Sequence, residues 1–200
     1  DHIPKKLVED QNSKLELLGY HPQVFARDIN FFYLDKDLRS RLEVSDDTFR
    51  VVDTALQFSK SEIEKMIVEE PNNLFNYSNV GYQTYFNSQE EIDLMEKLFF
   101  DAYRLGEVCG TISVSEPVFR DADLVSLDMT SVKSSDSGNF KNFQPNGFDG
   151  KQICSLSRYA GISDKVSAFG IFNHSNTLQE SALIAQIIWY FIEGVHYRSN

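Results

Sequence analysis

The chain has 200 residues, of which 42% are hydrophobic and 13% aromatic, enough to build one sizeable core. Its net charge of −11 argues against non-specific binding to nucleic acid or to anionic membranes. Two cysteines, Cys109 and Cys154, form no disulfide framework and favour a reducing, cytoplasmic compartment. No apolar run reaches membrane-spanning length. The first residues include neither an initiator methionine nor a signal peptide, which is typical of a processed or cut chain.

Residues 1–47 give the weakest pattern and are left unassigned. A charged helix is possible from Lys5 to Leu18, and it must end before Pro22 because the residue before a proline avoids the helical region. His2 and His21 have no partners at metal-ligand spacing, so we expect surface or capping roles for both.

From Thr48 onward, strand and helix patterns alternate. The sequence predicts strands near 49–53, 74–80, 123–128 and 165–171, and helices near 60–68, 89–105, 149–160 and 179–194. Ser61 with Glu64, and Ser88 with Glu91, have the spacing of capping boxes. Gly161 is expected to end its helix in the left-handed conformation. This alternation predicts an α/β fold, with a mainly parallel sheet covered by helices on both faces.

A carboxylate follows the third of these strands, the apolar run 124–127. Asp128 stands at its carboxyl end, the edge where parallel sheets bind ligands. Thr130 would point to the same side, because alternate residues of a strand share a face, and Lys133 lies in the turn beyond. The alternative is that Asp128 only caps the following turn.

Several segments in one order resemble a known family. They are PNNLFNYSNVGYQTYF (71–86), DAYRLGE (101–107), RDADLVSLD (120–128), PNGF (145–148), SRYAGISDKV (157–166) and LIAQIIWYFIEG (183–194). Together they resemble the C-terminal half of the arginase (ureohydrolase) family, in its divergent formimidoylglutamase-like branch from Bacteroidetes-type bacteria. The resemblance spans roughly 50–197, so residues 48–200 are expected to form an arginase-like domain and 1–47 a separate, unplaced segment.

The resemblance implies a three-layer α/β fold, incomplete in this chain, and a pair of manganese ions that activates water against guanidinium or formimino carbons. The family takes metal ligands from a Ser-x-Asp-x-Asp-x-x-Asp motif. Here Asp128 keeps the first aspartate, whereas Thr130 and Lys133 replace the other two. A threonine is a poor manganese ligand, and an ammonium group would repel the ions. Asp128 is thus a remnant metal position, and Thr130 and Lys133 are candidate binding residues.

The family's other motifs are altered further. Asp53 is the remnant of an Asp-Ala-His-x-Asp motif in which Ala55 replaces the histidine and Gln57 the last aspartate. A Gly-Gly-Asp-His motif is absent from the sequence. The guanidinium-binding glutamate would fall at Gln152, a candidate binding residue without the charge, and His174 matches no ligand position and is expected to be a surface or turn residue.

Two functions are therefore possible. The first is a non-catalytic arginase-fold protein with no cofactor, kept as a binding or assembly module that forms homo-oligomers or binds another protein. The second is a working manganese-dependent ureohydrolase that takes ligands from elsewhere. A Rossmann-type nucleotide site is disfavoured, because no Gly-x-Gly-x-x-Gly follows a strand.

The loop 134–147 and the residue after it carry Phe140, Phe143 and Phe148 among Ser, Asn and Lys. These side chains either form a contact surface or fold inward and fill the vacated metal pocket. Both alternatives predict no hydrolysis of arginine, agmatine or formiminoglutamate, and a loop ordered against the body or a partner chain.

Overall fold

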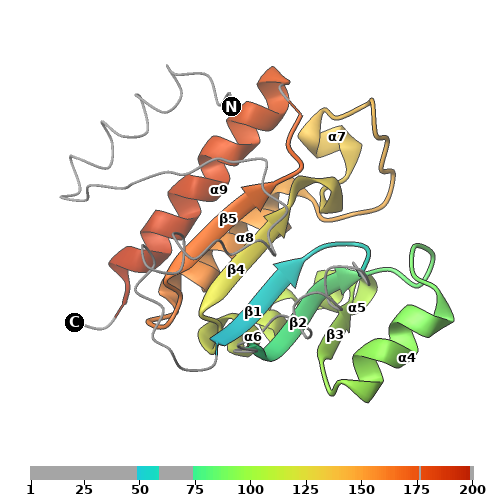
Figure 1. Cartoon of the computed structure of the whole chain (residues 1–200). Coiled ribbons are helices and arrows are strands. Elements are labelled where there is room, and N and C mark those ends of the chain that lie inside the picture. The colour runs from blue at the N-terminus through green and yellow to red at the C-terminus, as the bar shows by residue number, and fades with distance from the viewer. Residues whose placement is uncertain (1–48, 59–73, 176, 199–200) are drawn as a thin grey trace, which may run out of the picture.

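A computed structural model describes residues 49–58, 74–175 and 177–198. Its elements follow one another along the chain (Figure 1). They are β1 (Phe49–Thr54), β2 (Leu74–Tyr82), α4 (Gln89–Lys97), β3 (Asp101–Arg104), α5 (Leu105–Gly110), η1 (Ile112–Ser115), α6 (Glu116–Arg120), β4 (Leu124–Asp128), η2 (Met129–Ser131), α7 (Ser134–Ser137), α8 (Gly150–Ile162), β5 (Ala168–Phe172) and α9 (Leu178–His196). The unassigned segment 1–47 and the expected helix near 60–68, with Ser61 and Glu64, lie outside the described residues.

The five strands form one all-parallel sheet in the order β3-β2-β1-β4-β5, which confirms the predicted α/β class. β1 lies at the centre and pairs on one side with β2 and on the other with β4. Its side chains Val51 and Val52 point to opposite faces and are both buried. Apolar side chains on both faces are what a strand covered on two sides requires.

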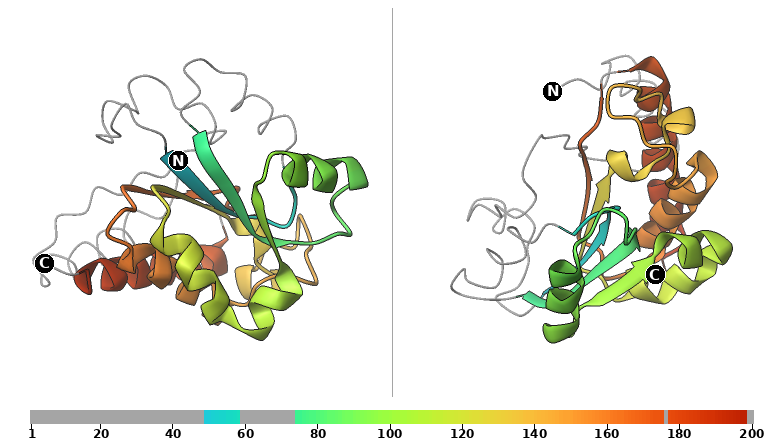
Figure 2. Two further views of the ribbon diagram at one scale, coloured as in Figure 1. Left: turned by 90° about the horizontal axis from the view of Figure 1, so that it is seen from below. Right: turned by 90° about the vertical axis from the view of Figure 1, so that its right-hand side faces the viewer.

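The larger core lies on the face covered by α5, α6, α8 and α9. It joins Val52, Val80 and Val125 of the sheet to Leu156 of α8 and Ile187 of α9. Helices α8 and α9 lie side by side on this face (Figure 2). A smaller core on the other face packs Met95 of α4 against the opposite side of the same strands. Among the described helices, four therefore lie on one face of the sheet, and α4 packs on the other.

The expected helix 89–105 is wrong in its second half. Helix α4 has the predicted capping box between Ser88 and Glu91 but ends at Lys97. Phe99 then adopts a left-handed conformation, with φ 56°, and its side chain is 90% exposed rather than buried on a helix face. The chain continues as the edge strand β3, paired with β2, before α5 begins at Leu105.

Gly161 does not have the predicted left-handed conformation, because α8 continues through it to Ile162. It is the site of the closest approach between α8 and α9. A Cβ on Gly161 would collide with the carbonyl of Phe191, and a Cβ on Gly194 would lie 2.8 Å from the Cα of Gly161. The two glycines let the helix backbones touch. Close packing, and not a C-terminal cap, therefore explains the glycine at position 161.

Candidate functional site

The carboxylate of Asp128 lies at the carboxyl edge of β4, as predicted, and the protein's own donors engage both of its oxygens. Oδ1 accepts hydrogen bonds from the backbone N–H and the hydroxyl of Thr130, each at 2.8 Å. Oδ2 accepts one from Asn173 Nδ2, at 3.1 Å, at the end of the neighbouring strand β5. Asp128 thus caps the η2 turn, as the alternative interpretation proposed, and also ties two strand ends together.

Asp53 lies on the same sheet face as Asp128 but lower along the strands. Its paired residue in β4 is Ser126, two residues before Asp128, and its paired residue in β2 is Asn79. The hydroxyl of Tyr77 donates to Asp53 Oδ2 at 3.0 Å. The two remnant positions are therefore near neighbours on one face of the sheet, but each carboxylate is hydrogen-bonded to its own partners.

The three residues proposed for binding have structural partners. Thr130 donates to Asp128, and Lys133 Nζ lies 3.7 Å from Asp136 Oδ1 in α7. Gln152 forms the capping box of α8 with Asp149: each side chain accepts a hydrogen bond from the other residue's backbone N–H, at 2.7 and 2.9 Å. Its amide therefore fixes the start of α8.

A thiol that the sequence analysis did not assign to any site lies beside Gln152. Cys109 Sγ is 3.5 Å from Gln152 Oε1. Burial raises the pKa of Cys109, and the charge of Asp149 adds to the rise, whereas Gln152 and the ammonium of Lys133 act the other way. The thiol is thus protonated at neutral pH and is not an activated nucleophile.

The donor set does not fit a pair of manganese ions. Among the described residues, no group of three or more His, Cys, Asp and Glu side chains is placed to hold a metal ion. A binuclear site needs several carboxylates to balance the charge of the cations. At this edge Asp128 and Asp53 stand with a threonine, a lysine and an asparagine instead.

The phenylalanines of the loop and of the residue after it differ in exposure. Phe148 is fully buried and lies against Gly81, whose φ of 111° and lack of a side chain admit the ring. Phe140 and Phe143 point outward, 67% and 61% exposed, with stacked rings whose centroids are 6.4 Å apart. One ring is therefore buried in the larger core, and the other two are exposed to solvent.

A second loop contacts this one. Gln83, just after β2, exchanges two side-chain hydrogen bonds with Asn146: its Nε2 donates to the Asn146 carbonyl at 2.8 Å, and its Oε1 accepts from Asn146 Nδ2 at 3.1 Å. Tyr85, in the same loop as Gln83, is 86% exposed. The sequence analysis did not single out Tyr85, because nothing local connects two loops 63 residues apart.

A buried acid and a histidine lie where β5 passes into α9. Glu180 is fully buried, and its Oε2 accepts hydrogen bonds from the backbone N–H and the hydroxyl of Ser175. Glu180 Oε1 and His174 Nε2 are both buried and have no hydrogen-bond partner among the described residues. Burial raises the pKa of Glu180, although the Ser175 bonds and the nearby His174 oppose the rise. His174 as a residue is half-buried in the segment between β5 and α9, and its Nε2 atom is buried.

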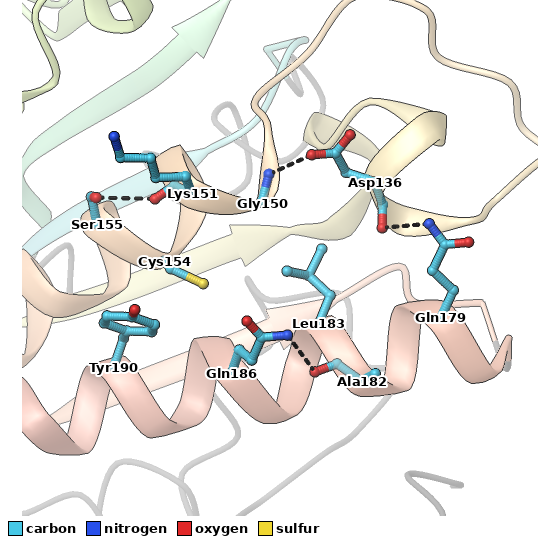
Figure 3. A pocket seen from close by; sticks show the side chains of 10 residues that line it. All are labelled: Asp136, Gly150, Lys151, Cys154, Ser155, Gln179, Ala182, Leu183, Gln186 and Tyr190. Carbon is cyan, nitrogen blue, oxygen red and sulfur yellow. Dashed lines mark hydrogen bonds between the residues drawn. The ribbon is translucent and has the colours of Figure 1, made fainter.

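Helices α8 and α9 also border a groove of about 600 Å³ on their outer side, closed at one end by Asp136 of α7 (Figure 3). Cys154 and Leu183 form part of its apolar lining, and Gln186 and Tyr190 line it from α9. Burial raises the pKa of Cys154 to about 11, so this thiol also stays protonated. None of the described helices combines the length and the apolar character needed to cross a bilayer.

In sequence, the N-terminal part of the chain is similar to a different family. Residues 1–80 match the family described as bacillithiol biosynthesis BshC, N-terminal Rossmann-like domain. A putative cysteine ligase BshC from Cytophaga hutchinsonii is 38% identical over 65 residues, which are 32% of this chain and 12% of that protein. The BshC of Christiangramia forsetii is 34% identical over 71 residues, 36% of this chain and 13% of that protein. The chain thus spans about an eighth of these curated relatives.

In structure, the chain is similar to arginase-superfamily proteins. The formimidoylglutamase of Bacillus subtilis superposes with a TM-score of 0.72 at 16% identity, covering 98% of this chain and 69% of that one. A Trypanosoma cruzi formiminoglutamase with Mn²⁺ gives 0.70 at 15% identity, over 82% and 60% of the two chains. An arginase-like protein from T. brucei, in a quadruple mutant, gives 0.61 at 13% identity, over 82% and 56%.

The sequence match and the structural match overlap in the central strands of the sheet. The match to the BshC family takes in the unassigned segment 1–47, and also β1 and most of β2, so it includes Asp53. It names a Rossmann-like domain, which the missing Gly-x-Gly-x-x-Gly had disfavoured. The solved neighbours, at 13–16% identity, establish the fold alone. The chain has the all-parallel α/β fold of the arginase-like formimidoylglutamases, and its first 80 residues resemble in sequence the Rossmann-like domain of BshC.

Proposed function

We propose that this chain is a non-catalytic protein with an arginase-like fold, which acts as a binding or assembly module without a manganese pair. One observation carries the proposal: the hydrogen bonds from Thr130 and Asn173 occupy the carboxylate of Asp128. Metal ligation through Oδ1 would have to displace the Thr130 hydroxyl and the backbone N–H that begins the η2 turn, and ligation through Oδ2 would compete with Asn173. The carboxylate is thus used as a structural tie between β4 and β5.

The charges around Asp128 support the same proposal. Lys133 occupies the position that corresponds in the family motif to a third metal-binding aspartate, and it forms an ion pair with Asp136. Replacing an aspartate by a lysine makes the local charge more positive by two units. An ammonium at a binuclear site would repel the ions instead of balancing them.

The test uses the full chain, purified with added manganese, then analysed for bound metal and assayed with arginine, agmatine and formiminoglutamate. We expect a manganese content well below one ion per chain and no release of urea or formamide. The alternative function, a manganese-dependent ureohydrolase, predicts about two ions per chain. It also predicts activity that disappears in Asp128→Ala, and finding both would overturn the proposal.

A variant that regains the metal ligands gives a positive result to measure, whereas the parent chain is expected to show neither bound manganese nor hydrolysis. Thr130→Asp combined with Lys133→Asp restores the two carboxylates of the family motif, and adding Ala55→His and Gln57→Asp restores the second motif. If the arginase-like geometry is retained, we expect the fourfold variant to bind manganese more tightly than the parent in calorimetry. Lys141→Asp with Lys151→Asp is the control, because these replacements add acid outside the edge. Equal manganese binding by both variants would mean that the motif positions do not lie close enough together to form one metal site.

A second candidate function follows from the sequence match of residues 1–80. Its curated relatives are named as putative cysteine ligases, so this part of the chain is a candidate for a role in thiol chemistry. If this function holds, the full chain incubated with cysteine and a set of amine acceptors would give a product that mass spectrometry finds heavier than the acceptor by one cysteine less one water. Product formation would favour it over the assembly role. The manganese content tests only the first candidate, so the two candidates can be told apart.

A further inference from the structure

The loop that follows α7 presents a preorganised pair of aromatic rings. Its neck is closed at Ser134, whose backbone N–H donates to the Gln144 carbonyl at 2.7 Å. The Ser134 hydroxyl donates to the Asn139 carbonyl at 2.8 Å and accepts from the Gln144 N–H at 2.7 Å. Inside the loop, Asn142 N–H donates to Asn139 Oδ1 at 3.2 Å. The backbone is thus fixed by polar groups beneath the rings, which lowers the ordering cost of binding.

The two rings at the end of this loop face outward, although the same loop region can bury a phenylalanine. Phe148 is 0% exposed, whereas Phe140 and Phe143 are 67% and 61% exposed and stack on each other with an interplanar angle of 19°. We call Phe140, Lys141 and Phe143 the aromatic tip. Exposed aromatic side chains on a rigid support are the groups that contribute most at the centres of protein interfaces.

Charge separates this region from the rest of the chain. The chain has a net charge of −11, but segment 137–148 contains no acidic residue and one cation, Lys141. The neighbouring segment 81–88, held to it through Gln83 and Asn146, contains no acidic residue either. An acidic partner would be repelled by most of this protein and least by the aromatic tip, which supplies an ammonium between two apolar rings.

We propose that the aromatic tip docks an acidic segment of another protein, one whose carboxylates alternate with large apolar side chains. The apolar side chains pack on the rings of Phe140 and Phe143, and a carboxylate pairs with Lys141. The inference rests on the proposed function only in taking the chain to be a binding module, and it gives that module its partner class.

The test uses the full chain and two synthetic peptides of about twelve residues. One alternates Asp or Glu with Leu and Phe, and the other has Lys in place of every acid. We expect saturable binding of the acidic peptide by fluorescence anisotropy, and binding at least about tenfold weaker for the basic one. Phe140→Ser with Phe143→Ser should weaken the acidic peptide by about tenfold or more, and Lys141→Glu should reverse the preference between the peptides.

Phe99→Ser is the matched control, because Phe99 is 90% exposed but lies beside α4, and this variant should bind as the parent does. Circular dichroism and thermal melting will check that the variants fold, which we expect because the replaced rings are exposed. Equal binding of both peptides, or no loss in the double variant, would overturn the proposal. A parent dimer in light scattering that the double variant dissociates would overturn it too, in favour of self-association. Manganese content and hydrolysis, measured on the same samples, test the proposed function separately.

Discussion

Single hydrogen bonds decide what the carboxyl edge can do. An aspartate at the end of a parallel strand can bind a metal, cap a turn or join two strands, and its donors select among these. Asp128 receives a backbone N–H, a hydroxyl and a carboxamide. Asn173, the source of the carboxamide, has φ 54°, a left-handed conformation that asparagine tolerates better than most residues. Asparagine at this position thus both allows the turn and donates a hydrogen bond to the carboxylate at the neighbouring strand end.

At the same scale, Glu180 should make stability depend on pH. Burial raises its pKa above the ordinary value of 4.5, so this group contributes stability that is complete below the unfolded pKa and is lost as pH rises through the folded pKa. Glu180→Gln keeps an oxygen acceptor for Ser175 but cannot ionise. We expect its free energy of unfolding to exceed the parent's increasingly from about pH 4.5 upward. Urea titrations across pH 4 to 8 measure the difference, and parallel curves for the two proteins would contradict it.

At the scale of elements, the contact between α8 and α9 depends on two glycines. A methyl group at Gly161 or Gly194 would meet the backbone of the other helix, so each Gly→Ala should cost about 1–3 kcal/mol of stability by overpacking. Gly106 in α5 is the control: a Cβ there meets nothing within 4 Å, and alanine should stabilise the helix by roughly 0.5–1 kcal/mol. Chemical denaturation gives both signs. A neutral Gly161→Ala would mean that the helices separate easily.

Elements with strong local patterns were predictable, and those defined by distant contacts were not. The apolar run 124–127 has no polar residue except Ser126, so the strand β4 follows from sequence within one residue. β3 is a four-residue edge strand whose side chains are mostly exposed, and it lacks the alternation that identifies strands. The apolar spacing of Met95, Leu98 and Leu105 continued the helical period through it. Only pairing with β2 distinguishes β3 from a helix turn.

The site followed the same division. The position of Asp128 at the edge, and its proximity to Thr130, came from strand geometry alone. Its bond to Asn173 crosses 45 residues, and the bonds between Gln83 and Asn146 cross 63, so no local pattern contains them. Gln152 shows a further limit, because the same residue type suits a remnant ligand position and a capping box. The contact with Asp149 shows that it forms the cap.

At the scale of the whole molecule, the part that matches the BshC family in sequence shares one sheet with strands that lie beyond the match. β1 and most of β2 lie in the part that matches the BshC family, whereas β3, β4 and β5 lie beyond it. Yet β1 is the central strand, and its register with β4 is continuous from Val51 to Thr54. Both of its faces contribute to a core, through Val51 on one side and Val52 on the other. Because β1 is central and contributes to both cores, we expect the stability of the other strands to depend on it.

We therefore expect a single cooperative unfolding unit across β1, β4 and α8. Val52 is 2% exposed in the larger core, and Val52→Ala should cost about 2 kcal/mol through lost burial and a cavity. If the sheet unfolds as one unit, Val52→Ala will lower the free energy of protection by the same amount for the amides of Val125 and Leu156 as for those of β1. Native-state hydrogen exchange measures these values. Val114→Ala, at a 40% exposed position in η1, should change none of them. Loss of protection confined to β1 would mean that the segment matching BshC folds as a separate unit within this sheet.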